Sequence, residues 1–146
     1  MAIDIDTIID LVLETSDEYK VILGKFYLEQ FIKGLEKGGL SDKEIGDMVL
    51  DFTKLLVSAD QDCSEKEYTF FANVTGISMS YDDFFERTNG GKSEDFIKAM
   101  FDFVKILTRE DRFSLIFFGI ALLCSDDTVT VDEQNLFRRI IETEYV

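Results

Sequence analysis

The feature that most constrains this chain is the segment from Phe113 to Cys124, which is apolar almost all the way round. A helix with large apolar side chains in every direction must be covered on several sides. The segment is well short of the roughly 20 apolar residues that a membrane-spanning helix needs. We therefore predict a buried central helix, and the length of 146 residues fits one domain built around it.

Other segments carry apolar residues on one face only, which is typical of helices at the surface of a bundle. In residues 45–56 and 96–107 the apolar positions recur at intervals of three and four. No stretch alternates with a period of two, so no strand is expected. The sequence predicts an all-α fold, a single helical bundle of seven or eight helices. The expected helices are 4–15, 17–37, 42–58, 65–75, 81–88, 93–108, 112–124 and 131–143.

Signals for helix starts and stops agree with these ranges. In a capping box, a Ser or Thr hydroxyl and a Glu three residues later satisfy each other's backbone amides. The matching segments are Ser41–Glu44, Ser64–Glu67 and Thr130–Glu133. We also expect helices to begin after N-caps at Ser16 and Ser93 and to end at Gly38-Gly39, Gly76 and Gly90-Gly91.

The chain contains an internal repeat, in which residues 55–67 align with residues 121–133 at a constant offset. Each copy has the end of an apolar helix, a small residue, an Asp, an acidic turn and a capping box. Such a self-match indicates two helix-turn-helix units that need each other for burial. The predicted single domain, 1–146, then comprises N-terminal helices (1–41), a first repeat (42–75) and a second repeat (93–143).

The repeated motif resembles the TerB-like family, named for a bacterial tellurite-resistance protein. The matching positions are Ala59, Asp60, Cys63, Ser64 and Glu67 in one copy and Ser125, Asp126, Val129, Thr130 and Glu133 in the other. Gln61 and Asp127 stand where the family usually has glycine. The resemblance implies a compact helical domain linked to metal-oxyanion or other chemical-stress responses, with acidic loops that bind cations. It implies no known reaction.

Composition excludes several function classes. Asp and Glu number 30 against 15 Lys and Arg, a formal charge of −15, so nucleic-acid binding and membrane insertion are not expected. There is no histidine, which removes imidazole catalysis and imidazole metal ligands. No supported nucleophile, phosphate-binding glycine loop or cofactor fingerprint is present, so we predict that the protein is not an enzyme.

The cysteines and the N-terminal segment indicate the compartment. Two cysteines, Cys63 and Cys124, are too few for a disulfide framework and lack a C-x-x-C spacing. Cys63 is next to Asp62 and Cys124 is two residues from Asp126; because nearby aspartates raise a thiol pKa, we expect both cysteines to pack rather than react. The first residues are acidic where a secretory signal would be basic. A cytoplasmic location is expected.

The two acidic turns are the candidate site, with two interpretations. Their carboxylates suit Ca²⁺, Mg²⁺ or Mn²⁺, and turns that lie on one side of the bundle could share an ion. The candidate ligands are Asp60, Asp62 and Glu67 in the first turn and Asp126, Asp127 and Glu133 in the second. Alternatively, Glu67 and Glu133 only cap helices, while the aspartates bond nearby backbone amides.

The preferred function is a non-enzymatic, stress-associated TerB-like binding module that recognises a cation or a protein partner through these turns. The alternative is a metal-free protein–protein interaction domain. In the N-terminal helices, a stripe formed by Ile22, Phe26 and Ile32 either caps the bundle or meets a partner. The oligomeric state is left open.

Overall fold

The computed structural model describes residues 5–57, 64–88, 93–126 and 129–142, and every regular element within these ranges is a helix. The helices are α1 (Ile5–Leu13), α2 (Asp17–Lys37), α3 (Asp42–Val57), α4 (Glu65–Thr75), α5 (Tyr81–Thr88), α6 (Glu94–Ile106), α7 (Arg109–Cys124) and α8 (Val131–Glu142). The all-α prediction is confirmed for this part of the chain. None of these helices is both long and apolar enough to cross a bilayer.

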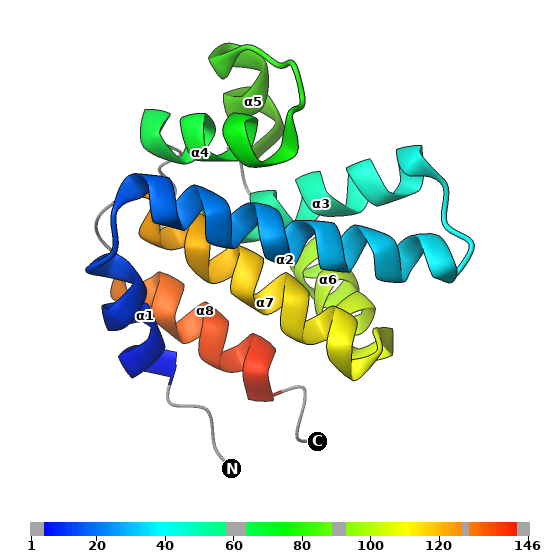
Figure 1. The fold of residues 1–146 in the computed structure, drawn as a ribbon. Coiled ribbons are helices and arrows are strands. Elements are labelled where there is room, and N and C mark those ends of the chain that lie inside the picture. The colour runs from blue at the N-terminus through cyan, green and yellow to red at the C-terminus, as the bar shows by residue number, and fades with distance from the viewer. Residues whose placement is uncertain (1–4, 58–63, 89–92, 127–128, 143–146) are drawn as a thin grey trace.

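Helix α7 lies at the centre of the bundle, with α2 along one side of it and α1 and α8 on the other (Figure 1). Its residues from Ser114 to Cys124 are buried except for the half-buried Phe117, so the predicted central helix is confirmed. Phe113, at the start of the apolar run, is 43% exposed, contrary to that prediction. It lies near the N-terminal end of α7, where its ring contacts Tyr27 and Phe117.

The start of α7 is the largest difference from the predicted boundaries. The helix begins at Arg109 rather than at residue 112. Thr108 is the reason, because its Oγ1 accepts a hydrogen bond from the backbone N–H of Asp111 at 3.2 Å and acts as the N-cap. The charged first turn, which has no apolar stripe, therefore belongs to the central helix.

Two glycines allow neighbouring helices to approach a backbone closely. A Cβ atom on Gly119 would lie 2.9 Å from side chains of both Leu56 and Phe137, so α3 and α8 pack directly onto α7. A Cβ atom on Gly24 would lie 2.6 Å from the ring of Phe70. Helix α4 consequently sits close against α2, on the side away from α8 (Figure 1).

The predicted helix caps are confirmed wherever the structure describes them. Ser16 and Ser93 accept hydrogen bonds from backbone amides three residues later. Gly76 ends α4 in the left-handed region, at φ 69° and ψ 8°, a conformation that favours glycine. The predicted stop at Gly90-Gly91 lies outside the described residues.

The N-terminal stripe divides between core and surface. Ile32 packs against the core, whereas Ile22 and Phe26 are 63% and 54% exposed. The buried side of α2 is formed instead by Lys20, Gly24, Leu28, Phe31 and Leu35. Ile22 and Phe26 therefore do not cap the bundle and remain available at the surface.

Candidate functional site

The first buried feature of the candidate site is the capping box at the start of α4. The Ser64 N–H donates to Glu67 Oε1, and the Glu67 N–H donates to Ser64 Oγ, each at 3.1 Å. The Ser64 hydroxyl also donates to Oε1 at 3.1 Å. Glu67 is only 2% exposed, and its second oxygen, Oε2, is buried without a hydrogen-bond partner among the residues that the structure describes. One carboxyl oxygen thus caps the helix and the other is unsatisfied.

The matching box at the start of α8 is built in the same way. The Thr130 N–H donates to Glu133 Oε1 at 2.9 Å, and the Glu133 N–H donates to Thr130 Oγ1 at 3.2 Å. Glu133 is 4% exposed. Both glutamates therefore cap their helices, as one of the two interpretations expects, and both are buried while they do so.

The electrostatics of Glu67 link the two turns. The pKa of Glu67 is raised from its usual 4.5 to about 8, mainly by burial and in smaller part by the negative charges of Glu133 and Asp126. Hydrogen bonds from Ser64 lower the pKa, but by less than burial raises it. These contributions mean that Glu133 and Asp126, from the second turn, lie within the range of charge interaction with Glu67.

The six predicted ligands are only partly described by the structure. Glu67, Glu133 and Asp126 have described positions, and Asp126 is half-buried just beyond the end of α7. Asp60, Asp62 and Asp127 lie outside the described residues. Within the described ranges, no group of three or more Cys, Asp or Glu side chains is close enough to hold a metal ion. The described carboxylates therefore do not by themselves complete a cation site.

A buried lysine near this region was missed by the sequence reasoning. Lys20, on the inner side of α2, is 2% exposed, and its Nζ lies 3.8 Å from Oδ1 of Asp17. It lines a cavity of about 290 Å³ between α2 and α4, whose wall also includes Glu65, Lys66 and Phe70. The spacing of Lys20 with Gly24, four residues later on the buried side of α2, is the sequence signal that could have indicated its burial.

Cys124 behaves as a core residue. It is fully buried, and its Sγ lies 3.8 Å from the Ile9 carbonyl oxygen. Burial raises the pKa of the thiol to about 12, with a smaller contribution in the same direction from Glu133, while Lys20 lowers it. The prediction that this cysteine packs rather than reacts is consistent with these surroundings. Cys63 lies outside the described residues.

The buried glutamates must carry the functional argument, because no protein-family model, curated protein or solved structure matches this chain. The likeness to the TerB-like family rests on the two sequence motifs. The chain's own residues, above all Glu67 with its unsatisfied oxygen, are what indicate a function.

Proposed function

We propose that this chain is a non-enzymatic TerB-like binding module that holds a divalent cation between its two acidic turns. The observation that carries the proposal is Glu67, whose Oε2 is buried and has no hydrogen-bond partner in the described part of the chain. A buried polar atom without a partner costs about 1–3 kcal/mol. A cation at this oxygen would remove that cost and would also relieve the repulsion from Glu133 and Asp126.

The chemistry of the donors favours a hard cation. Carboxylate oxygens suit Ca²⁺, Mg²⁺ and Mn²⁺, and Ca²⁺ takes about six to eight oxygen ligands. The described glutamates cannot fill such a shell alone. The remaining donors in this proposal are Asp126, the turn residues Asp60, Asp62 and Asp127, and water. An ion bound there would join the start of α4 to the start of α8 and so stabilise the bundle.

The cellular role follows from the family resemblance alone. A TerB-like module would act in a bacterial response to tellurite or another chemical stress, in the cytoplasm and together with a protein partner. Cation binding would then control how the module presents its surface to that partner. The motif positions Asp60, Ser64 and Glu67, with their counterparts in the second repeat, are the support for this assignment.

The test is the melting temperature with Ca²⁺ or Mn²⁺ against a control of matched ionic strength. The buffer should be at about pH 9, because a carboxyl group must lose its proton to bind a metal and the pKa of Glu67 is about 8. At a hundredfold excess over Kd, binding to the native state adds about 2.7 kcal/mol of stability. We expect the cation to raise the melting temperature of the wild type and of Glu44→Gln, but not that of Glu67→Gln.

A second variant, Asp60→Asn combined with Asp126→Asn, tests the turn aspartates. It should keep the fold but lose the rise in melting temperature that the cation causes in the wild type. If the cation does not raise the melting temperature of the wild type, the metal proposal is wrong. The metal-free interaction domain is then the better assignment. An exposed aromatic surface on α2, formed by Tyr19 and Phe26, favours that second candidate.

A further inference from the structure

Helix α2 exposes apolar side chains along its outer side. Tyr19, Ile22 and Phe26 are 49%, 63% and 54% exposed, and their spacing of three and four residues places them on one side of the helix. A single exposed apolar residue is ordinary, but a contiguous group on a soluble domain marks an interaction surface. Aromatic side chains are also enriched where proteins bind each other.

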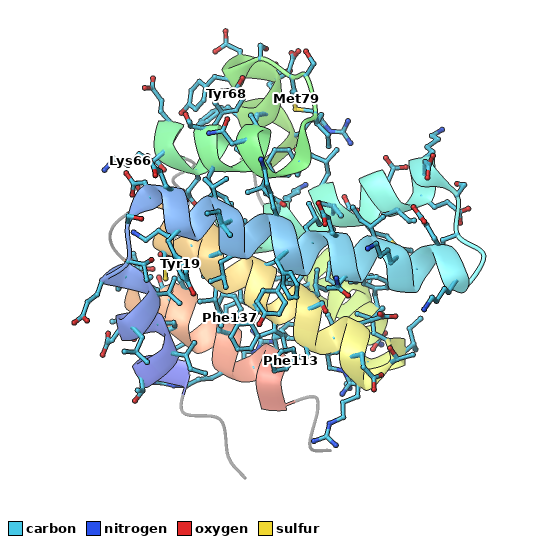
Figure 2. All side chains as sticks on the ribbon, in the orientation of Figure 1. Tyr19, Lys66, Tyr68, Met79, Phe113 and Phe137 are labelled. Atoms are coloured by element: carbon cyan, nitrogen blue, oxygen red, sulfur yellow. The ribbon has the colours of Figure 1, made fainter. Side chains whose placement is uncertain are left out.

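The group continues from α2 onto α7 through ring contacts. The ring centroids of Phe26 and Tyr27 lie 5.0 Å apart, and those of Tyr27 and Phe113 lie 6.0 Å apart. Phe113 is itself 43% exposed and is labelled on α7 in Figure 2, as Tyr19 is on α2. We name this surface the aromatic face and define it as Tyr19, Ile22, Phe26, Tyr27 and Phe113.

The charges beside the aromatic face differ from those of the chain as a whole. The chain carries a formal charge of −15, so most of its surface repels a second copy. Along the outer side of α2, however, the exposed charged residues are Glu18, Lys25, Glu29, Lys33, Glu36 and Lys37, three of each sign. The apolar stripe therefore lies on a locally neutral surface, where the self-repulsion of an acidic protein is weakest.

We propose that the aromatic face binds a second copy of this chain, with the two α2 helices antiparallel about a twofold axis that passes between Lys25 and Phe26. In this register Glu18 of one copy lies level with Lys33 of the other, and the symmetry repeats the pair. Phe26 of each copy lies beside the axis, so the two rings meet at the centre. A parallel arrangement would instead set each charged residue beside its own copy, which is repulsive.

The local charge pattern favours a second copy over a basic partner. A basic protein would be drawn to the acidic remainder of the surface rather than to its neutral part. At physiological ionic strength, charges more than about 8 Å apart are largely screened, so the distant carboxylates do not prevent self-association. This inference does not depend on the cation site.

The first test is sedimentation velocity of the full chain over a range of concentrations. We expect a concentration-dependent dimer for the wild type and a monomer for the double variant Ile22→Ser with Phe26→Ser. The matched control is Ile106→Ser, because Ile106 is 81% exposed on α6 and lies outside the aromatic face. It should dimerise like the wild type, and helical circular dichroism should be the same for all three proteins.

The second test exchanges the charges and fixes the register. With Glu18→Lys alone, the new lysine at position 18 of each copy lies level with Lys33 of the other copy. This places two repulsive pairs in the dimer, and we expect the dimer Kd to rise about tenfold. Adding Lys33→Glu to it restores opposite charges and should return Kd to within about threefold of the wild type. A wild type that stays monomeric at its highest soluble concentration, or a charge exchange that fails to restore the dimer, would overturn the proposal.

Discussion

Two capping boxes of the same sequence pattern differ in what surrounds them. In the box at the start of α3, the Ser41 N–H donates to Glu44 Oε1 and the Glu44 N–H donates to Ser41 Oγ, each at 3.2 Å. The box of Ser64 and Glu67 has the same two bonds at 3.1 Å. Glu44 is exposed, whereas Glu67 is buried with an unsatisfied oxygen. The local motif sets the hydrogen bonds, and the surrounding packing sets the chemistry.

The reason for the difference lies in the residues that follow each glutamate. Positions three, four and seven residues after a helical residue share its side of the helix. After Glu67 these positions are the buried Phe70, Phe71 and Val74, and after Glu133 they are the buried Leu136, Phe137 and Ile140. After Glu44 they are Asp47, Met48 and Asp51. Glu67 and Glu133 therefore lie in line with apolar stripes that carry them into the core.

The largest expected difference between the two boxes is in how the free energy of unfolding depends on pH. Because the folded pKa of Glu67 is about 8 against an ordinary value of 4.5, the protonated form is favoured in the folded state. Its stabilising contribution is complete below pH 4.5 and is lost as pH rises to about 8. In metal-free buffer, we expect the free energy of unfolding of the wild type to fall across this range by on the order of 4 kcal/mol more than that of Glu67→Gln.

Urea denaturation at several pH values measures this difference, with a chelator present throughout. Glu44→Gln is the control, because its carboxyl is exposed and its pH profile should follow that of the wild type. Parallel profiles for the wild type and Glu67→Gln would show that Glu67 keeps an ordinary pKa in the folded protein. The contrast between the two boxes would then be one of exposure only.

A smaller effect is expected from removing the hydroxyl of each cap. Ser41→Ala should cost about 1 kcal/mol of stability, because water can replace the lost bond at an exposed cap. Ser64→Ala should cost roughly 2–3 kcal/mol, because its hydroxyl both accepts from the Glu67 N–H and donates to Oε1 in a buried site. Urea denaturation at neutral pH compares the two variants. Equal losses of unfolding free energy would contradict the expected difference between the exposed box at α3 and the buried box at α4.

The smallest effect is the coupling between the two buried glutamates. At about pH 9, where Glu67 is ionised, a double-mutant cycle of Glu67→Gln and Glu133→Gln should give an interaction energy of about 1 kcal/mol, since each charge raises the cost of the other. The matched cycle of Glu67→Gln and Glu44→Gln should be additive to within about 0.5 kcal/mol. Additivity in both cycles, measured by urea denaturation, would place the two turns too far apart to share a ligand.

The sequence was sufficient for the all-α class and the helices but not for the whole site. Periodicity and caps predicted the eight helices of the described ranges to within a few residues, because both signals are local. The burial of Glu67 was readable from the apolar positions that follow it, although the capping motif alone does not indicate it. The nearness of Glu133 to Glu67 depends on how α4, α7 and α8 pack, which no local pattern specifies.

The most direct test of the central claim, that the two acidic turns hold a divalent cation at Glu67, is a Mn²⁺ titration followed by electron paramagnetic resonance, which measures the free ion. At about pH 9, where a group with a pKa of about 8 is ionised, we predict saturable binding by the wild type and by Glu44→Gln. Glu67→Gln, which removes the same charge from the same motif, should lose that binding. If both variants bind Mn²⁺ as the wild type does, the ion is held by surface carboxylates and the claim is contradicted.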